Sequence, residues 1–202
     1  SIRPGWFYHA KQDAQVKTVD QLLDIYYSSV GNGCNLLLNV PPDRRGRFHE
    51  VDCERLFGLK KVLDATFAKD LAQGKPVVAS DLRGNDAKFS AKMLTDGNRL
   101  TYWAANDDVR ACELTVDLET PTRLNRVRIQ EHIQRGQRID SFAVDARTNG
   151  TWKEIAAGTT IGVRKILRVP TVEADAIRLR IIESQACPTI STLELYVAPE
   201  RQ

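Results

Sequence analysis

The stretch GCNLLLNVPP, residues 33–42, decides the fold of the first third of the chain. Three consecutive leucines followed by Val40 place apolar side chains on both faces of one strand, which is typical of a parallel strand covered by helices on each side. Pro41 and Pro42 end that strand, because proline has no backbone N–H to donate to a neighbouring strand. We therefore expect a buried parallel strand at residues 36–40.

A helix is predicted on either side of this strand. Thr18 and Gln21 form a capping-box pattern, in which the threonine hydroxyl accepts from the Gln21 N–H while the glutamine side chain reaches back. Apolar residues recur at helical spacing through residues 19–30, and the glycines of residues 31–33 end the helix by adopting the left-handed conformation. A second helix is predicted at about residues 51–67. The order of helix, buried strand, loop and helix predicts the end of a (β/α) barrel.

The apolar spacing changes from helical to alternating after residues 71–75, a segment with Gly74 that we expect to be a linker. Residues 114–118, LTVDL, show the new pattern, in which apolar and polar side chains alternate. Several similar segments follow, and each can bury one face and expose the other. This pattern predicts an antiparallel β-sandwich over residues 76–198, preceded by a barrel portion over residues 1–70.

The composition excludes several classes of partner. A hydrophobic content of 42% and a charged content of 27% are ordinary for a soluble globular protein. A net charge of +3 is too small to indicate binding to nucleic acid or to an anionic membrane. No apolar run approaches the ~20 residues that a membrane-spanning helix needs. The four cysteines lack metal-type spacing, and they leave the redox compartment open.

Two runs resemble a known enzyme family: SIRPGWFYH at residues 1–9 and LLLNVPPDRRG at residues 36–46. Together they resemble the last strands and loops of the catalytic barrel in α-L-fucosidases of glycoside hydrolase family 29. The resemblance implies an exo-acting, retaining hydrolase that removes terminal α-L-fucose from glycans without a catalytic cofactor. It also favours a periplasmic or extracellular location, and it places the front of the barrel upstream of Ser1.

The same resemblance implies substrate-binding roles for Trp6 and His9, because loops at the carboxyl ends of barrel strands form the active site. The indole of Trp6 can cover the apolar face and methyl group of a 6-deoxy sugar. The alternatives are that Trp6 belongs to the barrel core, as we expect for Phe7, and that His9 supports the loop. Retaining glycosidases use two carboxyl groups ~5 Å apart. We expect both upstream of Ser1, and we assign no catalytic carboxylate to these residues.

The run LTDGNRLTYWA at residues 94–104, together with Glu194, resembles the discoidin (coagulation-factor C-type) jelly rolls. This is the galactose-binding-like fold of carbohydrate-binding module family 32, and the resemblance implies a structural calcium ion. The implied ligands are the Met93 carbonyl and the side chains of Asp96, Asn98, Thr101 and Glu194. They supply the oxygen atoms that calcium prefers. The alternative is that residues 96–98 form an ordinary tight turn and that Glu194 is an exposed strand residue.

The run EHIQRGQRI, residues 131–139, resembles a segment in the accessory modules of the same fucosidases. Gly136 predicts a turn that exposes His132 and Arg135, whose side chains can donate to sugar hydroxyl groups. A sugar site usually also offers an aromatic plane, and none lies beside this run in the sequence, so packing against the barrel is the alternative. Two functions therefore stay open: part of a fucosidase, or a carbohydrate-binding module without catalysis of its own.

Overall fold

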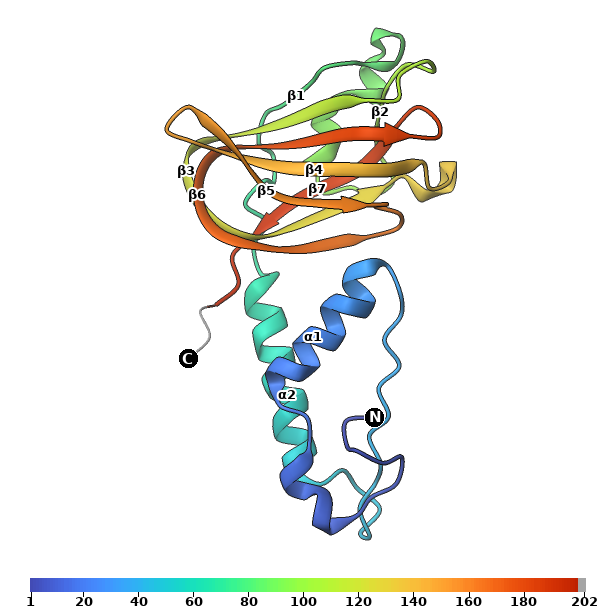
Figure 1. The fold of residues 1–202 in the computed structure, drawn as a ribbon, viewed down its shortest axis with the longest axis vertical. Coiled ribbons are helices and arrows are strands. Elements are labelled where there is room, and N and C mark those ends of the chain that lie inside the picture. Colours follow the sequence, from blue (N-terminus) through green and yellow to red (C-terminus); the bar gives the residue numbers. More distant parts are fainter. Residues whose placement is uncertain (200–202) are drawn as a thin grey trace. The chain divides into compact units, whose positions relative to one another are not determined.

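The computed structural model describes residues 1–199, which divide into two compact units. The first contains Ser1–Ala68 and the second Lys69–Ala198 (Figure 1). The first is built from helices and coil, and the second from antiparallel strands. No helix within the described residues is both long enough and apolar enough to cross a membrane.

The first unit contains the two predicted helices, α1 (Val19–Ser29) and α2 (Glu50–Thr66). The capping box is confirmed, because Thr18 Oγ1 accepts from the Gln21 N–H at 3.3 Å and Gln21 Oε1 accepts from the Thr18 N–H at 2.9 Å. After α1, a short 3-10 turn ends at Gly33, whose φ of 80° is the left-handed conformation that glycine adopts easily. The local sequence thus determines both ends of α1.

A small core lies between these helices and the coil. Ile2, Val16 and Leu22 are buried, and residues of α1, α2 and the coil segment pack against them. The partly buried members are Ile25, Leu38, Val40, Val51, Leu56 and Leu59.

The strand predicted at residues 36–40 is wrong for the described part of the chain, where residues 34–43 form coil. The Ile2 N–H donates to the Asn39 carbonyl at 2.9 Å, but no regular ladder develops between these segments. The side chain of Leu37 is 96% exposed, so one of the two predicted faces is not covered. A strand forms only where neighbouring strands supply partners, and residues 1–68 supply none.

The second unit is a sandwich of antiparallel strands, as predicted. The strands are β1 (Val77–Ala79), β2 (Trp103–Ala104), β3 (Cys112–Glu131), β4 (Ile139–Thr148), β5 (Thr151–Thr159), β6 (Lys165–Ser184) and β7 (Thr189–Tyr196). Their order is β2-β7-β3-β6-β4-β5, with β1 paired to β3. The long strands β3 and β6 bend around the sandwich (Figure 1), and their shared ladder changes register after Asp117 and again after Leu124. Such irregularities let one strand serve both layers.

The alternation of residues 114–118 is confirmed, because Leu114, Val116 and Leu118 are all fully buried. Trp103 is also fully buried, and its indole N–H donates to the Asp81 carbonyl at 2.9 Å. This bond satisfies the one polar atom of the indole inside the core.

The segment predicted as a linker, residues 71–75, packs into the second unit. The Leu71 N–H donates to the Leu195 carbonyl at 2.8 Å, and Asp70 Oδ1 accepts from the N–H groups of Ala72 and Leu195, each at 2.9 Å. Ala72 is fully buried. The boundary between the compact units accordingly falls between Ala68 and Lys69.

Candidate functional sites

The first candidate site is the loop that carries Trp6. The side-chain amide of Asn39 donates to the Trp6 carbonyl at 3.0 Å and to Ser1 Oγ at 3.1 Å, and Ser1 Oγ donates to the Gly5 carbonyl at 2.7 Å. The indole of Trp6 is nevertheless 71% exposed. Phe7, which we expected in the core, is 79% exposed. The backbone of the loop is therefore held while both aromatic side chains remain accessible in this unit.

The same N-terminal segment contains a buried arginine, Arg3, that no sequence pattern marked as a candidate. Arg3 Nε donates to Asp52 Oδ2 at 2.9 Å, and Arg3 Nη1 donates to Asp13 Oδ1 at 2.8 Å. Burial would lower the pKa of Arg3, but the hydrogen bonds that Arg3 donates to Asp52 and Asp13 raise it above its ordinary value. The guanidinium also lies 4.8 Å from the centre of the Tyr8 ring. The only signal in the sequence was a charged residue between Ile2 and a proline.

An open cavity of about 410 Å³ lies in the same unit. Its lining residues are Tyr8, Ala10, Asp43, Arg44, Arg45, His49 and Glu50, and neither Trp6 nor His9 is among them. The side chain of His9 is exposed, and its carbonyl accepts from the Gln12 N–H at 2.9 Å at the start of a 3-10 turn. Asp43 accepts from Arg45 Nε at 2.9 Å, and this hydrogen bond lowers the pKa of Asp43 to about 2. The structure thus does not bring Trp6 and His9 together at one cavity.

In the second unit, the predicted calcium loop is closed by its own side chains. Asp96 Oδ1 accepts from the Asn98 N–H at 2.7 Å, and Asp96 Oδ2 accepts from the Thr101 hydroxyl at 2.6 Å. Gly97 between them has a φ of +77°. The Thr101 hydroxyl also lies 2.7 Å from the Asn98 carbonyl. Three oxygen-bearing residues therefore converge in this loop.

Glu194, the remaining carboxylate of the predicted set, lies on β7 and forms an ion pair with Arg128 of β3. It is largely buried, so the alternative of an exposed strand residue is wrong. Within residues 1–199, no three histidine, cysteine, aspartate or glutamate side chains gather as metal ligands would. The calcium ligands Met93, Asp96, Asn98, Thr101 and Glu194 stay a prediction.

The run EHIQRGQRI forms a loop anchored by a buried glutamate. Glu131 Oε1 accepts from the N–H groups of Arg138 at 2.7 Å and Ile139 at 3.2 Å. Glu131 Oε2 accepts from the Gly162 N–H at 2.6 Å. One carboxylate therefore ties the loop between β3 and β4 to the turn that precedes β6.

His132 does not lie in the exposed position that we predicted, since only 7% of it is accessible. Its imidazole stacks on the ring of Tyr102, with the ring centres 4.0 Å apart and the planes 12° from parallel. Its backbone N–H donates to the Thr189 carbonyl at 3.1 Å. Burial lowers the pKa of His132, and the charge of Arg135 lowers it further.

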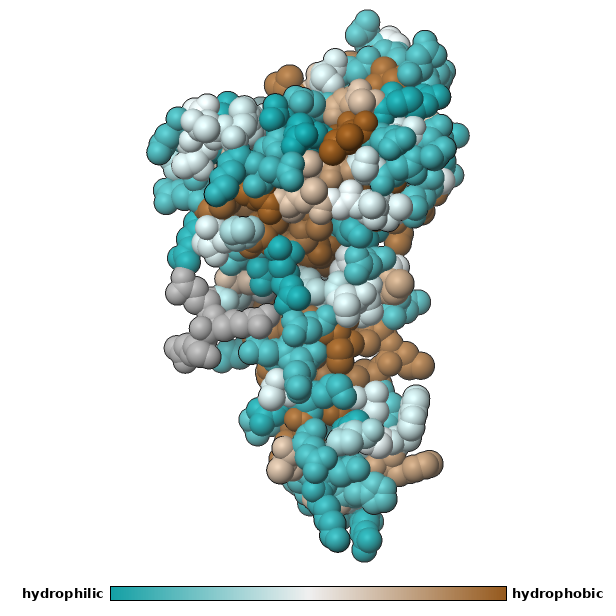
Figure 2. Space-filling view, viewed as in Figure 1, coloured by the Kyte–Doolittle hydropathy of each residue, from teal (hydrophilic) through white to brown (hydrophobic). Residues whose placement is uncertain are grey.

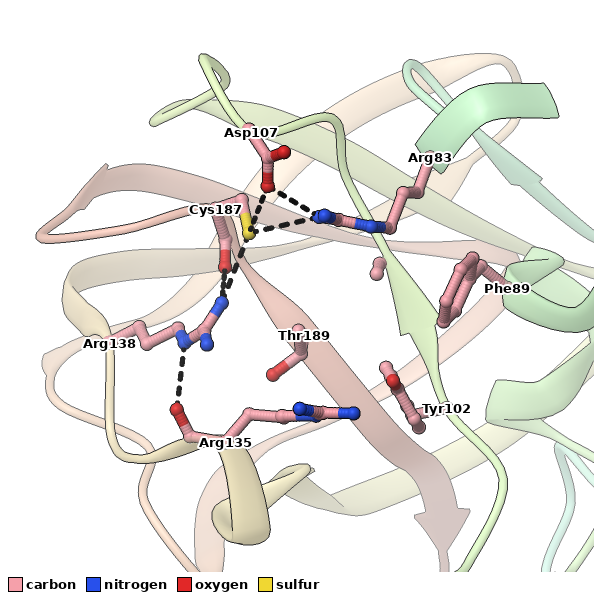
Figure 3. A pocket seen from close by; sticks show the side chains of 9 residues that line it. Arg83, Phe89, Tyr102, Asp107, Arg135, Arg138, Cys187 and Thr189 are labelled. Atoms are coloured by element: carbon pink, nitrogen blue, oxygen red, sulfur yellow. Dashed lines mark hydrogen bonds and ion pairs between the residues drawn. The ribbon is translucent and has the colours of Figure 1, made fainter. Parts of the chain in front are cut away.

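Tyr102 of this stack also lines a cavity of about 190 Å³ (Figure 3). Its lining residues are Arg83, Phe89, Tyr102, Ala104, Asp107, Arg135, Arg138, Cys187 and Thr189. Arg135 is exposed, as predicted, and its guanidinium extends toward the Tyr102 ring (Figure 3). The aromatic plane that the sequence seemed to lack comes from Phe89 and Tyr102, whose rings lie 5.4 Å apart. They were missed because they precede Arg135 by more than thirty residues.

Comparison with known proteins agrees with both parts of this description. Residues 76–194 match the F5/8 type C domain, and residues 1–66 match the alpha-L-fucosidase family. Alpha-L-fucosidase 1 of Arabidopsis thaliana is 36% identical over 98% of this chain, which corresponds to 39% of that protein. The chain spans about two-fifths of the length of the curated relatives it matches.

Solved structures give the same result. The crystal structure of SpGH29 is 39% identical with a TM-score of 0.91 over 98% of this chain and 43% of that one. A Ruminococcus gnavus GH29 fucosidase in complex with fucose is 34% identical, also with a TM-score of 0.91, over 98% of this chain and 40% of that one. The chain therefore belongs to the F5/8 type C domain family through its sandwich, and over almost its whole length it is a homologue of the GH29 α-L-fucosidases.

Proposed function

We propose that this chain is the C-terminal part of an exo-acting, retaining α-L-fucosidase that hydrolyses terminal α-L-fucose from glycans. Residues 1–70 would be the end of its catalytic (β/α) barrel, and residues 76–198 would be an accessory sandwich. The observation that carries the proposal is the similarity of both parts, in the same order, to GH29 fucosidases. One of these relatives is described in complex with fucose.

The surface of the first unit supports the barrel assignment. Large hydrophobic side chains lie exposed on it, and Figure 2 shows apolar residues at its surface. They are Trp6, Phe7, Leu37, Phe48 and Phe57. Exposed apolar groups on so small a unit indicate that other structure covers part of them in the whole protein. The remaining strands and helices of the barrel would do so, and they would give residues 36–40 the neighbours that a strand requires.

Within that barrel, Trp6 and His9 would contact the sugar. The loop backbone is held by Asn39 and Ser1, so the indole of Trp6 can be presented in one orientation. An indole face can pack on the apolar face of a pyranose and on the methyl group that distinguishes fucose. His9 is exposed beside it in the sequence, and its imidazole can donate to a hydroxyl group.

The catalytic carboxyl groups would come from upstream of Ser1. In the first unit, the carboxylates near the Trp6 loop already bind arginines: Asp13 and Asp52 bind Arg3, and Asp43 binds Arg45. A nucleophile must instead face the anomeric carbon, with the acid/base group ~5 Å away.

The direct test is fucose release. The full-length protein that contains these residues should hydrolyse an aryl α-L-fucoside, whereas the 202-residue chain should not, because the two catalytic carboxyl groups would lie upstream of Ser1. Turnover by the 202-residue chain above the uncatalysed rate would contradict the placement of those groups. No turnover by the folded full-length protein would contradict the proposed activity.

A second function, sugar binding by the sandwich, is favoured by one observation. Tyr102 and Phe89 lie at the same cavity as Arg135, which combines aromatic surface with hydrogen-bond donors. His132, the other predicted sugar contact, would not touch the sugar but would support the Tyr102 ring by stacking on it. This binding would accompany the hydrolase and is no alternative to it.

We also propose a structural calcium ion in the sandwich. Carboxylate, amide, hydroxyl and carbonyl oxygens are the ligands that calcium prefers, and the convergence of Asp96, Asn98 and Thr101 fits that chemistry. The Met93 carbonyl and Glu194 would complete the set. Glu194 would then be shared between the ion and Arg128.

A further inference from the structure

The cavity of the sandwich contains a polar atom that the rest of the protein does not satisfy. Thr189 is almost fully buried, and its hydroxyl has no hydrogen-bond partner among the described residues. Thr189 lines the cavity, and Figure 3 shows its hydroxyl turned toward the side chains of Arg135 and Arg138. Leaving a buried hydroxyl unpaired is costly, and a ligand in the cavity can supply the missing partner.

The charges around the cavity select the kind of ligand. Three guanidinium groups and one carboxylate line it, which leaves a net charge of +2. Asp107 pairs with Arg83 at 2.7 Å. Among residues 1–199, no side-chain ion pair joins Arg135 or Arg138 to a carboxylate, and the nearest negative charge to Arg138 is the buried Glu131, which binds the Arg138 backbone N–H. Two arginines at one small cavity whose guanidinium groups form no ion pair favour an anionic ligand.

One of these arginines is held in place. Arg138 Nε donates to the Arg135 carbonyl at 3.0 Å, and Arg138 Nη1 donates to the Cys187 carbonyl at 2.8 Å. Its guanidinium therefore keeps one orientation at the cavity wall (Figure 3). Within the described residues, the guanidinium of Arg135 has no such hydrogen bonds, so it can adjust to a ligand. A fixed donor beside an adjustable one suits a carboxylate or sulfate group, which accepts several hydrogen bonds at once.

The size and the aromatic wall restrict the ligand further. A cavity of about 190 Å³ is smaller than the roughly 300–1,000 Å³ of pockets that enclose a drug-sized ligand, so it suits one sugar unit and not an oligosaccharide. Phe89 and Tyr102 offer apolar surface that a bare inorganic anion would not use.

From these observations we propose that the cavity binds an acidic sugar, with its carboxylate or sulfate ester against Arg135 and Arg138, its ring against Tyr102, and a hydroxyl group bonded to Thr189. This inference rests on the proposed sugar binding by the sandwich and names its ligand class. It implies that the sandwich recognises an anionic part of a glycan, distinct from the neutral fucose on which the barrel would act.

The test is isothermal titration of the 202-residue chain with galacturonate and with galactose, which share a ring and differ in the charge at C6. Galacturonate should bind at least tenfold more tightly, and added salt should weaken it. Arg135→Gln should weaken galacturonate binding about 10- to 100-fold, since hydrogen bonds to charged groups contribute on that scale. The matched control Arg123→Gln removes an exposed arginine of β3 outside the cavity and should bind normally.

Thr189→Val provides an independent variant because it removes only the unpaired hydroxyl. It should weaken galacturonate binding while leaving the melting temperature equal or higher. Equal binding of galactose and galacturonate would overturn the acidic class while leaving sugar binding intact. Equal binding of inorganic sulfate and sugar sulfate would overturn the role of the ring. If the folded chain binds neither sugar, both the proposed sugar binding by the sandwich and its acidic ligand class are wrong. The proposed hydrolase activity is tested separately, by fucose release from the full-length protein.

Discussion

The ring of Tyr102 lies flat against the imidazole of His132, at 4.0 Å between ring centres. This contact joins the loop before β2 to the loop after β3, and it places the aromatic surface of Tyr102 at the same cavity as Arg135. It also removes His132 from solvent. In the proposed sugar site, His132 would therefore support the ring of Tyr102, and Tyr102 would contact the sugar.

The first prediction follows from the lowered pKa of His132. In the unfolded chain this imidazole returns to its usual pKa of ~6.5, so below that pH the unfolded state binds more protons than the folded state. The free energy of unfolding should therefore decrease as the pH falls below ~6.5. Chemical denaturation at pH 7.5 and at pH 5.5 measures the difference, and His132→Gln should show a smaller one.

Arg135 contributes to the same shift, so its removal gives a sharper test. In Arg135→Gln the pKa of His132 should increase, because a nearby positive charge no longer disfavours the imidazolium. An NMR titration of the imidazole C–H signals measures it. An unchanged pKa would show that burial alone lowers it.

A second prediction concerns Glu131. Each of its carboxylate oxygens accepts backbone N–H groups, so Glu131→Gln would turn an amide NH₂ toward at least one donor and leave it unpaired. The loss should be about 1–3 kcal/mol in the free energy of unfolding. Denaturant titration measures it, with the exposed Glu183→Gln as the control that should change stability by less than ~0.5 kcal/mol. Equal stability of both variants would contradict the anchoring role.

The sequence predicted those features that depend on neighbouring residues. The capping box of Thr18 and Gln21 and the alternation of residues 114–118 are both local patterns, and both are confirmed. The strand at residues 36–40 was wrong for this chain because its apolar pattern says nothing about which strands are present to pair with it. The sequence also did not show that residues 71–75, predicted as a linker, pack into the sandwich. The Leu71 N–H donates to Leu195 of β7, which lies at the other end of the sandwich sequence.

The candidate site was less accessible to sequence analysis. Arg135 was identified from its own loop, but Tyr102 reaches the cavity from the loop before β2 and Thr189 from the start of β7, both far away in the sequence. No local pattern marks Thr189 as unpaired, because its state depends on which groups the fold places around it. The resemblance to discoidin domains located the sandwich, and the match to the F5/8 type C domain confirms it.

A third prediction concerns calcium. A bound ion stabilises the folded state by ~2.7 kcal/mol when its concentration is a hundredfold above its dissociation constant. Chelator should lower the melting temperature of the 202-residue chain, and calcium should restore it better than magnesium. Asp96→Asn should reduce this response, because it removes a charge and leaves the ion pair of Glu194 with Arg128 intact. If neither chelator nor calcium changes the melting temperature, the calcium site is wrong and residues 96–98 form an ordinary tight turn.

A fourth prediction concerns Trp6 in the full-length protein. If the indole contacts fucose, Trp6→Ala should reduce kcat/KM about 10- to 200-fold. Stability should decrease by less than the ~3–5 kcal/mol typical of a core tryptophan, since the indole is largely exposed in this unit. Steady-state kinetics beside a melting curve separate the two roles. Normal kinetics, or a variant that does not fold, would contradict the substrate contact and would indicate that Trp6 belongs to the barrel core.

Asn39 offers a related test of the loop backbone. Its amide donates to the Trp6 carbonyl and to Ser1 Oγ, so Asn39→Ala should leave the loop less ordered. In the full-length protein, kcat/KM should then decrease even though the indole is still present. Wild-type kinetics in a folded variant would contradict the positioning role.

The central claim is that this chain completes an α-L-fucosidase, and the release of L-fucose from an aryl α-L-fucoside tests it most directly. We predict turnover by the full-length protein, inhibition by free L-fucose, and no turnover by the 202-residue chain. A folded full-length protein that leaves the fucoside intact while hydrolysing a different aryl glycoside would contradict the claim.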